Sequence, residues 1–352
     1  MAADGSMPRS MRDPARDDFY RRIADRHLTP LWEVLHGLVP RQPNTACAPA
    51  FWCYREIRSH LLEAGRLVTA AEAERRVLIL ENPAYPGESR LTNSLYGGLQ
   101  LINPGEVARS HRHTQSALRF VMEGKGAFTA VDGEKAPMQR GDLILTPAWT
   151  WHDHGHEGHG PCIWFDALDI PLVRYLAAGF AEGAEFQSQP VQRPEGDSLA
   201  RFGANMLPVD WQPQTQASPV FAYPYERSRA ALARLAAAGP ADPIHGVKMR
   251  YVNPANGGDA LPTISAFLQL LPARFDGRWY RCTDAAVHIV VEGEGRTELE
   301  DGAFDWGPGD IFVVPNWARH RHTAGREAVL FSYSDRVIHQ KLGLWREDRD
   351  PT

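Results

Sequence analysis

The feature of this sequence that most limits its fold is an internal repeat. The stretch RFVMEGKGAFTAVDGE, which begins at Arg119, aligns with HIVVEGEGRTELEDGA, which begins at His288. Further along, GDLILTPAWTWHDH from Gly141 aligns with GDIFVVPNWARHRH from Gly309. The offsets are 288 − 119 = 169 and 309 − 141 = 168 residues, so a slip of one residue separates the two copies. A chain of 352 residues then divides most simply into two similar units.

Each copy has the pattern of short β-strands. Apolar or alternating runs of roughly four to eight residues are interrupted by Gly, Asp and Pro, and Asp132-Gly133 and Asp301-Gly302 are expected to be turns. Short strands at close spacing predict a sandwich or a barrel.

The spacing of glycine, histidine and proline in the first copy resembles that of the cupin superfamily. A glycine, five residues and an HxH pair run from Gly105 to His113, and a glycine, five residues and a proline run from Gly141 to Pro147. The resemblance implies a mainly β bicupin with two jelly-roll barrels in tandem. The expected parts are an N-terminal arm (1–89), mostly helical after a disordered start of about a dozen residues, a barrel with the metal site (90–182), a partly helical connector (183–257), and a second barrel with the C-terminal tail (258–352).

Helical spacing of apolar residues occurs outside the two copies. It predicts helices from Asp18 to Val39 and from Tyr54 to Val68 in the arm, and a short helix from Ser228 to Gly239 in the connector.

Composition excludes several classes of protein. A net charge of −5 offers no basic face for nucleic acid, and no apolar run is long enough to span a bilayer. The four cysteines form no CxxC pair, and the N-terminus has no signal-peptide core. We therefore expect a cytoplasmic protein with reduced thiols and no nucleic-acid or membrane partner.

The histidines of the first copy predict a metal site. His111 and His113 are one residue apart, so on a strand both side chains point to the same face. The same alternation continues to Arg119, and we expect this face to point into the barrel. His152, which follows the second motif, then approaches from across the sheet. Three neutral imidazoles can bind one divalent cation and leave coordination positions open, whereas HxH alone is also common on protein surfaces.

No acidic ligand accompanies these histidines. Metal-binding cupins commonly add a glutamate three or four residues after HxH, where this chain has Ala117 and Leu118. Arg119 is expected to be a buried cation, which is costly without an anion. A substrate carboxylate suits the guanidinium fork, and a salt bridge to Asp166 is the alternative; the two can coexist.

The second copy has lost this pattern. Tyr280 and Cys282 stand where the first copy has its HxH pair, while His320 and His322 remain. We expect a metal-free barrel retained for packing and dimerisation. A zinc site formed by Cys282, His288, His320 and His322 is the alternative.

A longer match is more specific than the cupin motifs. The stretch YGGLQLINPGEVARSHRHTQSALRFVMEGKGAFTAVDGE, followed by GDLILTPAWTWHDHG, resembles the gentisate 1,2-dioxygenases and the related salicylate and 1-hydroxy-2-naphthoate dioxygenases. The resemblance covers most of the chain. It implies one Fe(II) per subunit in the first barrel, held by His111, His113 and His152, and a homotetramer.

The resemblance also implies roles for other residues. Arg119 would hold the substrate carboxylate, His154 would lie near the ring hydroxyls as a proton acceptor, Asp166 would fix the tautomer of His154, and Arg75 would reach the site from the arm.

One strand precedes the HxH pair and is expected to line the pocket. By alternation, Tyr96, Gly98 and Gln100 share a face. In the resemblance, tyrosine at position 96 accompanies cleavage of gentisate and tryptophan accompanies cleavage of salicylate. Val77 and Gly97 lie in the same neighbourhood and could affect the choice of substrate as much as Tyr96.

The resemblance therefore implies cleavage of gentisate by O₂ between the carboxyl-bearing carbon and the adjacent hydroxyl-bearing carbon, giving maleylpyruvate. Three alternatives stay open. They are a salicylate or 1-hydroxy-2-naphthoate dioxygenase of the same family, a bicupin that binds a small acid without catalysis, and a manganese-dependent isomerase or oxalate-type cupin, which the missing glutamate disfavours.

Overall fold

The computed structural model describes residues 13–349, so the start that was expected to be disordered lies outside the described range. The chain divides into two compact units at Asn44/Thr45. The first unit contains α1 (Pro14–Ala24) and α2 (Leu31–Leu38). The single helix predicted from Asp18 to Val39 is thus two helices. Pro30 separates them, because its ring disfavours a helical conformation for the preceding residue and it has no N–H to donate.

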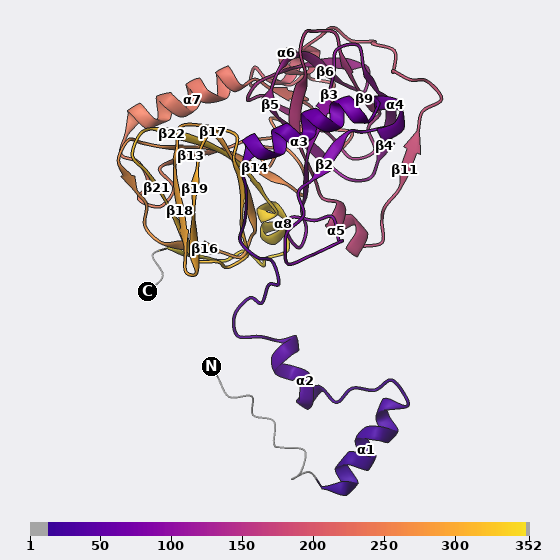
Figure 1. Ribbon diagram of the computed structural model, residues 1–352, viewed down its shortest axis with the longest axis vertical. Helices are drawn as coiled ribbons and strands as arrows, with labels where there is room; N and C mark the ends of the chain where they lie inside the picture. Colours follow the sequence, from indigo (N-terminus) through magenta and orange to yellow (C-terminus); the bar gives the residue numbers. More distant parts are fainter. Residues whose placement is uncertain (1–12, 350–352) are drawn as a thin grey trace. The chain divides into compact units, whose positions relative to one another are not determined.

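The second unit contains two β-barrels, each built from two sheets (Figure 1). In the first barrel, a six-stranded sheet has the order β12 (Ala222–Tyr223), β8 (Leu143–Thr146), β5 (Ala117–Glu123), β10 (Cys162–Leu168), β3 (Tyr96–Ile102), β2 (Val77–Ile79). A five-stranded sheet faces it, in the order β11 (Ala181–Gly183), β4 (Val107–His113), β9 (His152–His156), β6 (Lys125–Val131), β7 (Glu134–Gln139).

The second barrel repeats this plan. One sheet has the order β1 (Ala50–Trp52), β20 (Ile311–Val314), β17 (Ala286–Glu292), β22 (Ala328–Ser334), β14 (Ser265–Leu271), β13 (Val247–Arg250). The other has the order β19 (Gly302–Trp306), β18 (Gly295–Leu299), β21 (His320–Ala324), β16 (Tyr280–Cys282), β23 (Glu347–Arg349), with β15 (Phe275–Asp276) also paired to β21. The mainly β bicupin fold is therefore confirmed.

Six helices accompany the barrels in the described part of this unit. They are α3 (Tyr54–Leu67), α4 (Ala70–Ala73), α5 (Ile170–Tyr175), α6 (Asp197–Phe202), α7 (Tyr225–Ala238) and α8 (Arg336–Lys341). None of the described helices has the length and apolarity needed to cross a membrane.

The largest core lies between the barrels. The outward faces of the two six-stranded sheets carry apolar side chains that belong to one buried cluster. Phe120 of β5 stacks on Phe331 of β22 with 4.2 Å between ring centroids, and Phe165 of β10 lies 5.8 Å from Tyr333. Each of these strands is buried on both faces, which explains its nearly continuous apolar sequence.

The chain has two halves, each made of a barrel and the segment that precedes it: the arm with the first barrel, and the connector with the second. Each preceding segment contributes a strand to the barrel of the other half. β1 belongs to the arm but pairs with β20 of the second barrel, whereas β12 belongs to the connector but pairs with β8 of the first barrel. The helices that follow are held in the same crossed manner. The backbone N–H of Tyr54, at the start of α3, donates to the Asp310 carboxylate (2.9 Å), and that of Tyr225, at the start of α7, donates to Asp142 (2.8 Å). The predicted helical arm thus also supplies two strands, β1 and β2.

These helices extend the repeat beyond the two aligned segments. Arg58 of α3 forms a salt bridge with Glu123 at 2.7 Å, and Arg229 of α7 forms one with Glu292 at 3.2 Å. The arm and the connector are therefore copies of each other, in addition to the barrels.

The slip of one residue between the copies has a structural position. In β6, the register shifts between Lys125 and Ala127, so Gly126 is an extra residue, while β18 pairs with β19 without interruption. The turn after β18 is consequently formed by residues 300–301, and Gly302 already belongs to β19. The predicted Asp301-Gly302 turn was wrong by one residue.

Candidate active site

The two histidines of the HxH pair lie on β4 and point into the first barrel. Arg112, between them, points outward, where its guanidinium bonds Glu182 at 2.6 Å and covers the Trp149 ring. β4 ends at His113, and β5, which carries Arg119, belongs to the opposite sheet. The expectation of one continuous strand from the histidines to Arg119 was wrong, because residues 114–116 separate β4 from β5. Arg119 still faces the histidines, from the opposite wall.

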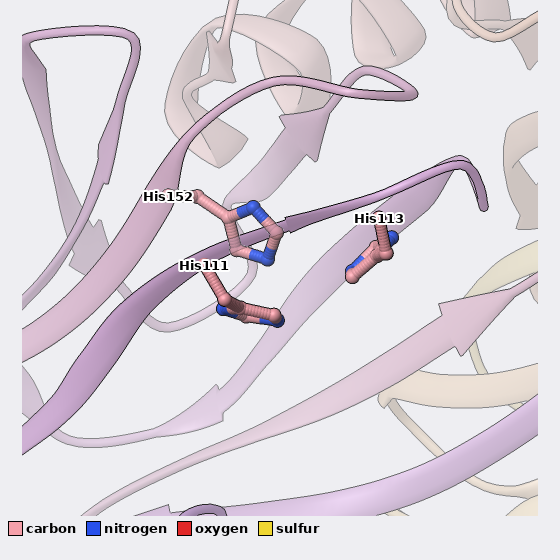
Figure 2. Close-up of side chains that lie close together, drawn as sticks. All are labelled: His111, His113 and His152. Atoms are coloured by element: carbon pink, nitrogen blue, oxygen red, sulfur yellow. The ribbon is translucent and has the colours of Figure 1, made fainter. Parts of the chain in front are cut away.

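His152 stands at the start of β9 and pairs directly with His111 of β4. The rings of His111, His113 and His152 point toward one another (Figure 2). One ligand nitrogen from each lies within 4.8 Å of the others, and this is the one group of three or more potential metal ligands among the described residues. The ring centroids of His111 and His152 are 4.1 Å apart.

Hydrogen bonds orient two of these rings for metal binding. His113 Nδ1 lies 2.9 Å from the Gln115 carbonyl oxygen, and His152 Nδ1 lies 2.9 Å from that of Thr150. A carbonyl only accepts, so each Nδ1 carries the hydrogen and each Nε2 keeps its lone pair. His152 Nε2 is buried without a hydrogen-bond partner. These donors fit a divalent cation.

The surroundings keep the three imidazoles neutral. Burial, with the nearby Arg75 and His113, lowers the pKa of His111 to about 2, and burial with Arg119 lowers that of His113 to about 4. The pKa of His152 is also far below its ordinary value, chiefly because of burial. Neutral rings are the metal-binding form, and in His113 and His152 the free lone pair is on Nε2.

Arg119 is buried next to Asp166, as the salt-bridge alternative predicted. Arg119 Nε lies 3.3 Å from Asp166 Oδ1, without the alignment of a hydrogen bond, and Nη1 donates to Thr146 Oγ1. Burial raises the pKa of Asp166 to about 6 even though the guanidinium opposes this shift. Arg119 Nε nevertheless has no hydrogen-bond partner, which leaves the guanidinium suited to a further anion.

Arg75, in the arm, lies beside His111. Its guanidinium contacts His111 Nδ1 and donates to the Arg109 carbonyl oxygen at 2.7 Å. Burial and the neighbouring Arg119 lower the pKa of Arg75 to about 10. Arg75 and His111 also line a cleft of about 670 Å³, together with Arg109 and Ser110. Arg75 thus lies at the entrance to the metal-binding residues.

Tyr96, Gly98 and Gln100 lie along β3, on the wall that also carries Asp166. Gly98 pairs directly with Asp166, and Gln100 pairs with Trp164. A Cβ atom at position 98 would lie 2.7 Å from Val77 Cγ1 and 3.0 Å from the Leu78 carbonyl oxygen, so the close packing of β2 against β3 requires glycine here. Gln100 and Tyr96 are both buried.

His154 lies two residues after His152, and its partner differs from the expected one. His154 Nδ1 is 3.0 Å from Thr129 Oγ1, while Asp166 accepts a hydrogen bond from Trp164 Nε1 (3.0 Å) and pairs with Arg119. Thr129, rather than Asp166, therefore contacts His154. His154 Nε2 is buried without a hydrogen-bond partner.

The corresponding region of the second barrel has different chemistry. Tyr280 pairs with His320 in the register in which His111 pairs with His152. The side chains there line a cavity of only about 30 Å³, together with Lys248. Burial lowers the pKa of Lys248 to about 8, which leaves it mostly cationic at neutral pH. The proposed zinc ligands Cys282, His288, His320 and His322 do not form a ligand group, in the part of the chain that the structure describes.

Comparison with known proteins identifies the family. Residues 98–170 match the cupin domain model. Gentisate 1,2 dioxygenase 1 of Aquipseudomonas alcaligenes is 55% identical over 335 residues, which are 95% of this chain and 96% of that protein. The chain belongs to the gentisate 1,2-dioxygenase family.

Other family members and their structures agree. The 5-aminosalicylate 1,2-dioxygenase of Comamonas sp is 36% identical over 337 residues, covering 94% of this chain and 89% of that protein. A crystal structure of salicylate 1,2-dioxygenase from Pseudaminobacter salicylatoxidans superposes with a TM-score of 0.90 at 31% identity, covering 96% of this chain and 99% of that chain. This gentisate dioxygenase family member is thus a ring-cleaving dioxygenase whose first barrel carries a three-histidine site.

Sequence reasoning missed three residues of this dioxygenase site: Thr129, Thr146 and Trp164. Thr146 and Trp164 contact Arg119 and Asp166, and nothing in the sequence pattern distinguishes them from core residues. Thr129 had a signal, because Thr297 occupies the same place in the second barrel, opposite His322. Alignment without the extra Gly126 pairs Thr129 with Glu298 instead and hides this match.

Proposed function

We propose that this chain is an Fe(II)-dependent gentisate 1,2-dioxygenase. It would cleave gentisate between the carboxyl-bearing carbon and the adjacent hydroxyl-bearing carbon, and both atoms of O₂ would enter the product, maleylpyruvate. The observation that carries the proposal is the convergence of His111, His113 and His152 opposite the buried Arg119, with no acidic ligand among them. The relative that is 55% identical is a gentisate dioxygenase by name, and a salicylate dioxygenase that superposes with a TM-score of 0.89 was crystallised with gentisate.

The metal would be held by the lone pairs of the three imidazoles. Bound Fe(II) supplies the redox chemistry with O₂, and a ligand set without carboxylates leaves it a full positive charge and open positions for an anionic substrate. His113 and His152 are already oriented for this by the carbonyl oxygens that accept from their Nδ1 atoms.

Arg119 would bind the substrate carboxylate. Its Nε is buried without a hydrogen-bond partner, so a substrate carboxylate placed there would gain a charge-assisted interaction. The carboxylate fixes the ring, which places the adjacent hydroxyl on the side of the three histidines.

His154 would accept a proton from a ring hydroxyl. Its pKa is well below the ordinary value because of burial and Arg119, so the ring is neutral, and its buried Nε2 has no hydrogen-bond partner. A neutral imidazole with a free lone pair can act as a base. Tyr96, Gly98 and Gln100 would form the wall against which the substrate ring lies. Arg75 would line the cleft through which the substrate enters.

A substrate panel tests the proposal. Iron-loaded protein is mixed under air with gentisate, salicylate, 5-aminosalicylate and 1-hydroxy-2-naphthoate, and O₂ uptake is recorded together with the absorbance of the ring-opened product. We expect the highest kcat/KM with gentisate. Preference for salicylate or the naphthoate would favour the alternative substrates, and no uptake with any hydroxylated benzoate would favour a bicupin that only binds acids.

The proposal includes a cytoplasmic homotetramer. The four cysteines are free in the structure, which fits a reducing compartment. Size-exclusion chromatography with light scattering measures the assembly directly.

A further inference from the structure

Thr129 on β6 is a buried polar residue that the proposed chemistry has not yet used. It lies directly opposite His154 on β9, and both side chains are fully buried. Thr129 Oγ1 is within hydrogen-bond distance of two atoms, His154 Nδ1 at 3.0 Å and Met138 Sδ at 3.6 Å. The direction of these two contacts decides which nitrogen of His154 carries its hydrogen.

Counting donors gives one direction. A thioether sulfur only accepts, so the contact with Met138 is a hydrogen bond only if the Thr129 hydroxyl donates to it. The hydroxyl oxygen then accepts from His154 Nδ1–H, and both contacts are hydrogen bonds. If the hydroxyl donated to Nδ1 instead, the sulfur would have no donor and one of the two bonds would be lost. The first arrangement leaves Nε2 with a free lone pair.

The second barrel has the same threonine–histidine pair with the opposite polarity. Thr297 Oγ1 lies 2.9 Å from His322 Nδ1. Trp306 stands in β19 where Met138 stands in β7, and its Nε1–H donates to Thr297 Oγ1 at 2.9 Å. Because an indole N–H only donates, the Thr297 hydroxyl hydrogen is available for His322 Nδ1. Of the two groups that contact Thr297 Oγ1, His322 Nδ1 is the one that can accept this hydrogen, so we expect the hydroxyl to donate to it, which puts the hydrogen of His322 on Nε2.

We propose that Thr129, oriented by Met138, is a positioning residue that holds His154 as the Nδ1–H tautomer with Nε2 free to accept a proton from the substrate. The exchange of methionine for tryptophan reverses this tautomer in the second barrel. The inference rests on the proposed function for the role of Nε2, but the tautomer itself is a property of the protein alone.

Nuclear magnetic resonance tests the tautomer without any activity measurement. Full-length protein labelled with ¹⁵N-histidine is loaded with diamagnetic Zn²⁺ in place of iron, and long-range ¹H–¹⁵N spectra distinguish protonated from unprotonated ring nitrogens. His154→Gln and His322→Gln variants assign the two spin systems. We expect Nδ1–H for His154 and Nε2–H for His322. An Nε2–H tautomer at His154 overturns the proposal.

Kinetics of iron-loaded variants test the consequence. Thr129→Val keeps the shape but removes the hydroxyl, and we expect kcat for gentisate to fall about 10- to 100-fold, the usual range for a lost outer partner of a site histidine. KM and iron content should stay within about twofold of the unaltered enzyme, because such a partner acts on the proton rather than on binding. Thr129→Ser, which restores the hydroxyl, should recover most of kcat.

Thr297→Val is the matched control, since it removes the same hydroxyl from the other barrel. It should leave kcat unchanged; an equal loss in both variants, or none in Thr129→Val, would overturn the proposal. If Thr129→Val fails to fold, Met138→Leu removes only the sulfur acceptor at similar volume, and it should weaken the preference for Nδ1–H so that the Nε2–H tautomer of His154 appears in the same spectra. Absence of turnover by the unaltered enzyme would refute the proposed function and leave the nitrogen spectra as the test of the tautomer.

Discussion

The two barrels share a fold and differ in what their interiors can bind. Each has a six-stranded sheet against the common core, an inserted strand from the other half and a helix capped by the other half's Gly-Asp turn. In the first barrel, three imidazoles converge opposite a guanidinium, whereas in the second a phenol, a thiol and an amine stand among four imidazoles around a cavity of about 30 Å³. The difference indicates that the framework is maintained by contacts outside the barrels, so the interior of one barrel could change without loss of the fold.

The largest effect should come from the metal-binding histidines. His113→Ala removes one of three lone pairs, so iron content should fall to near zero and activity by about a thousandfold or more, because the metal accounts for several kcal/mol of transition-state stabilisation. Cys282→Ala makes the matched change in the second barrel. Metal analysis by mass spectrometry and O₂ uptake give the result; loss of iron in the Cys282 variant would show that the second barrel also takes part in metal binding.

Arg119 and His288 occupy the same position in the two barrels. Their replacement by alanine should differ in its effect on KM for gentisate, and this is the next largest effect that we expect. Arg119→Ala should raise KM for gentisate about 10- to 100-fold, since a charge-assisted hydrogen bond contributes about 1.5–3 kcal/mol. Iron should be retained, and His288→Ala should leave KM unchanged. Steady-state kinetics on iron-loaded protein decide this, and normal turnover by the arginine variant would refute the carboxylate role.

Asp335 and Asp169 each accept a hydrogen bond from the other half of the chain, and the two hydrogen bonds should contribute similarly to the free energy of unfolding. Asp335 accepts from Ser94 Oγ at 2.5 Å, and Asp169 accepts from Thr263 Oγ1 at 2.5 Å. Removal of either hydroxyl, in Ser94→Ala or Thr263→Val, leaves a buried carboxylate short of one donor, at a cost of about 1–3 kcal/mol. Urea unfolding gives the free energy of unfolding of both variants. A clear difference between the two losses would show that one hydrogen bond stabilises the contact between the halves more than the other.

The last expected effect is a pH dependence of stability that arises from Asp169. Burial raises the pKa of Asp169 to about 6 in the folded protein, above its ordinary value of 3.8. Between these values the folded state holds a proton that the unfolded chain has lost, so the contribution of Asp169 to stability declines as pH rises from about 4 to about 6. The Asp169→Asn variant should therefore lose less stability than the unaltered protein between pH 4.5 and pH 6.5. Equal pH slopes in urea unfolding would contradict this.

The sequence predicted the fold through its repeat and predicted the convergence of the three histidines through their spacing. These predictions succeeded because strand alternation and glycine–proline turns depend on neighbouring residues and can be recognised in a single sequence. It failed where the outcome depended on pairing between distant segments. Nothing local reveals that Ala50–Trp52 pairs with β20, that Thr129 rather than Asp166 contacts His154, or that β4 and β5 lie in opposite sheets.

The copying of the arm by the connector was hidden for another reason. Tyr54, Arg58 and Leu61 match Tyr225, Arg229 and Leu232, but the other residues of the two helices differ. Three matching residues in a helix are too few to recognise without the contacts with Asp310 and Asp142.

The crossed strands β1 and β12 have a consequence for dissection of the molecule. A break in the chain after α6 would separate β1 from its partner β20 and β12 from its partner β8. Each fragment would then have an unpaired sheet edge and one strand that normally pairs with the other fragment. Such fragments should be poorly soluble when made separately and should recover a working enzyme when made together. Each barrel thus needs a strand from the other half of the chain, which gives a physical reason for the second barrel to be retained.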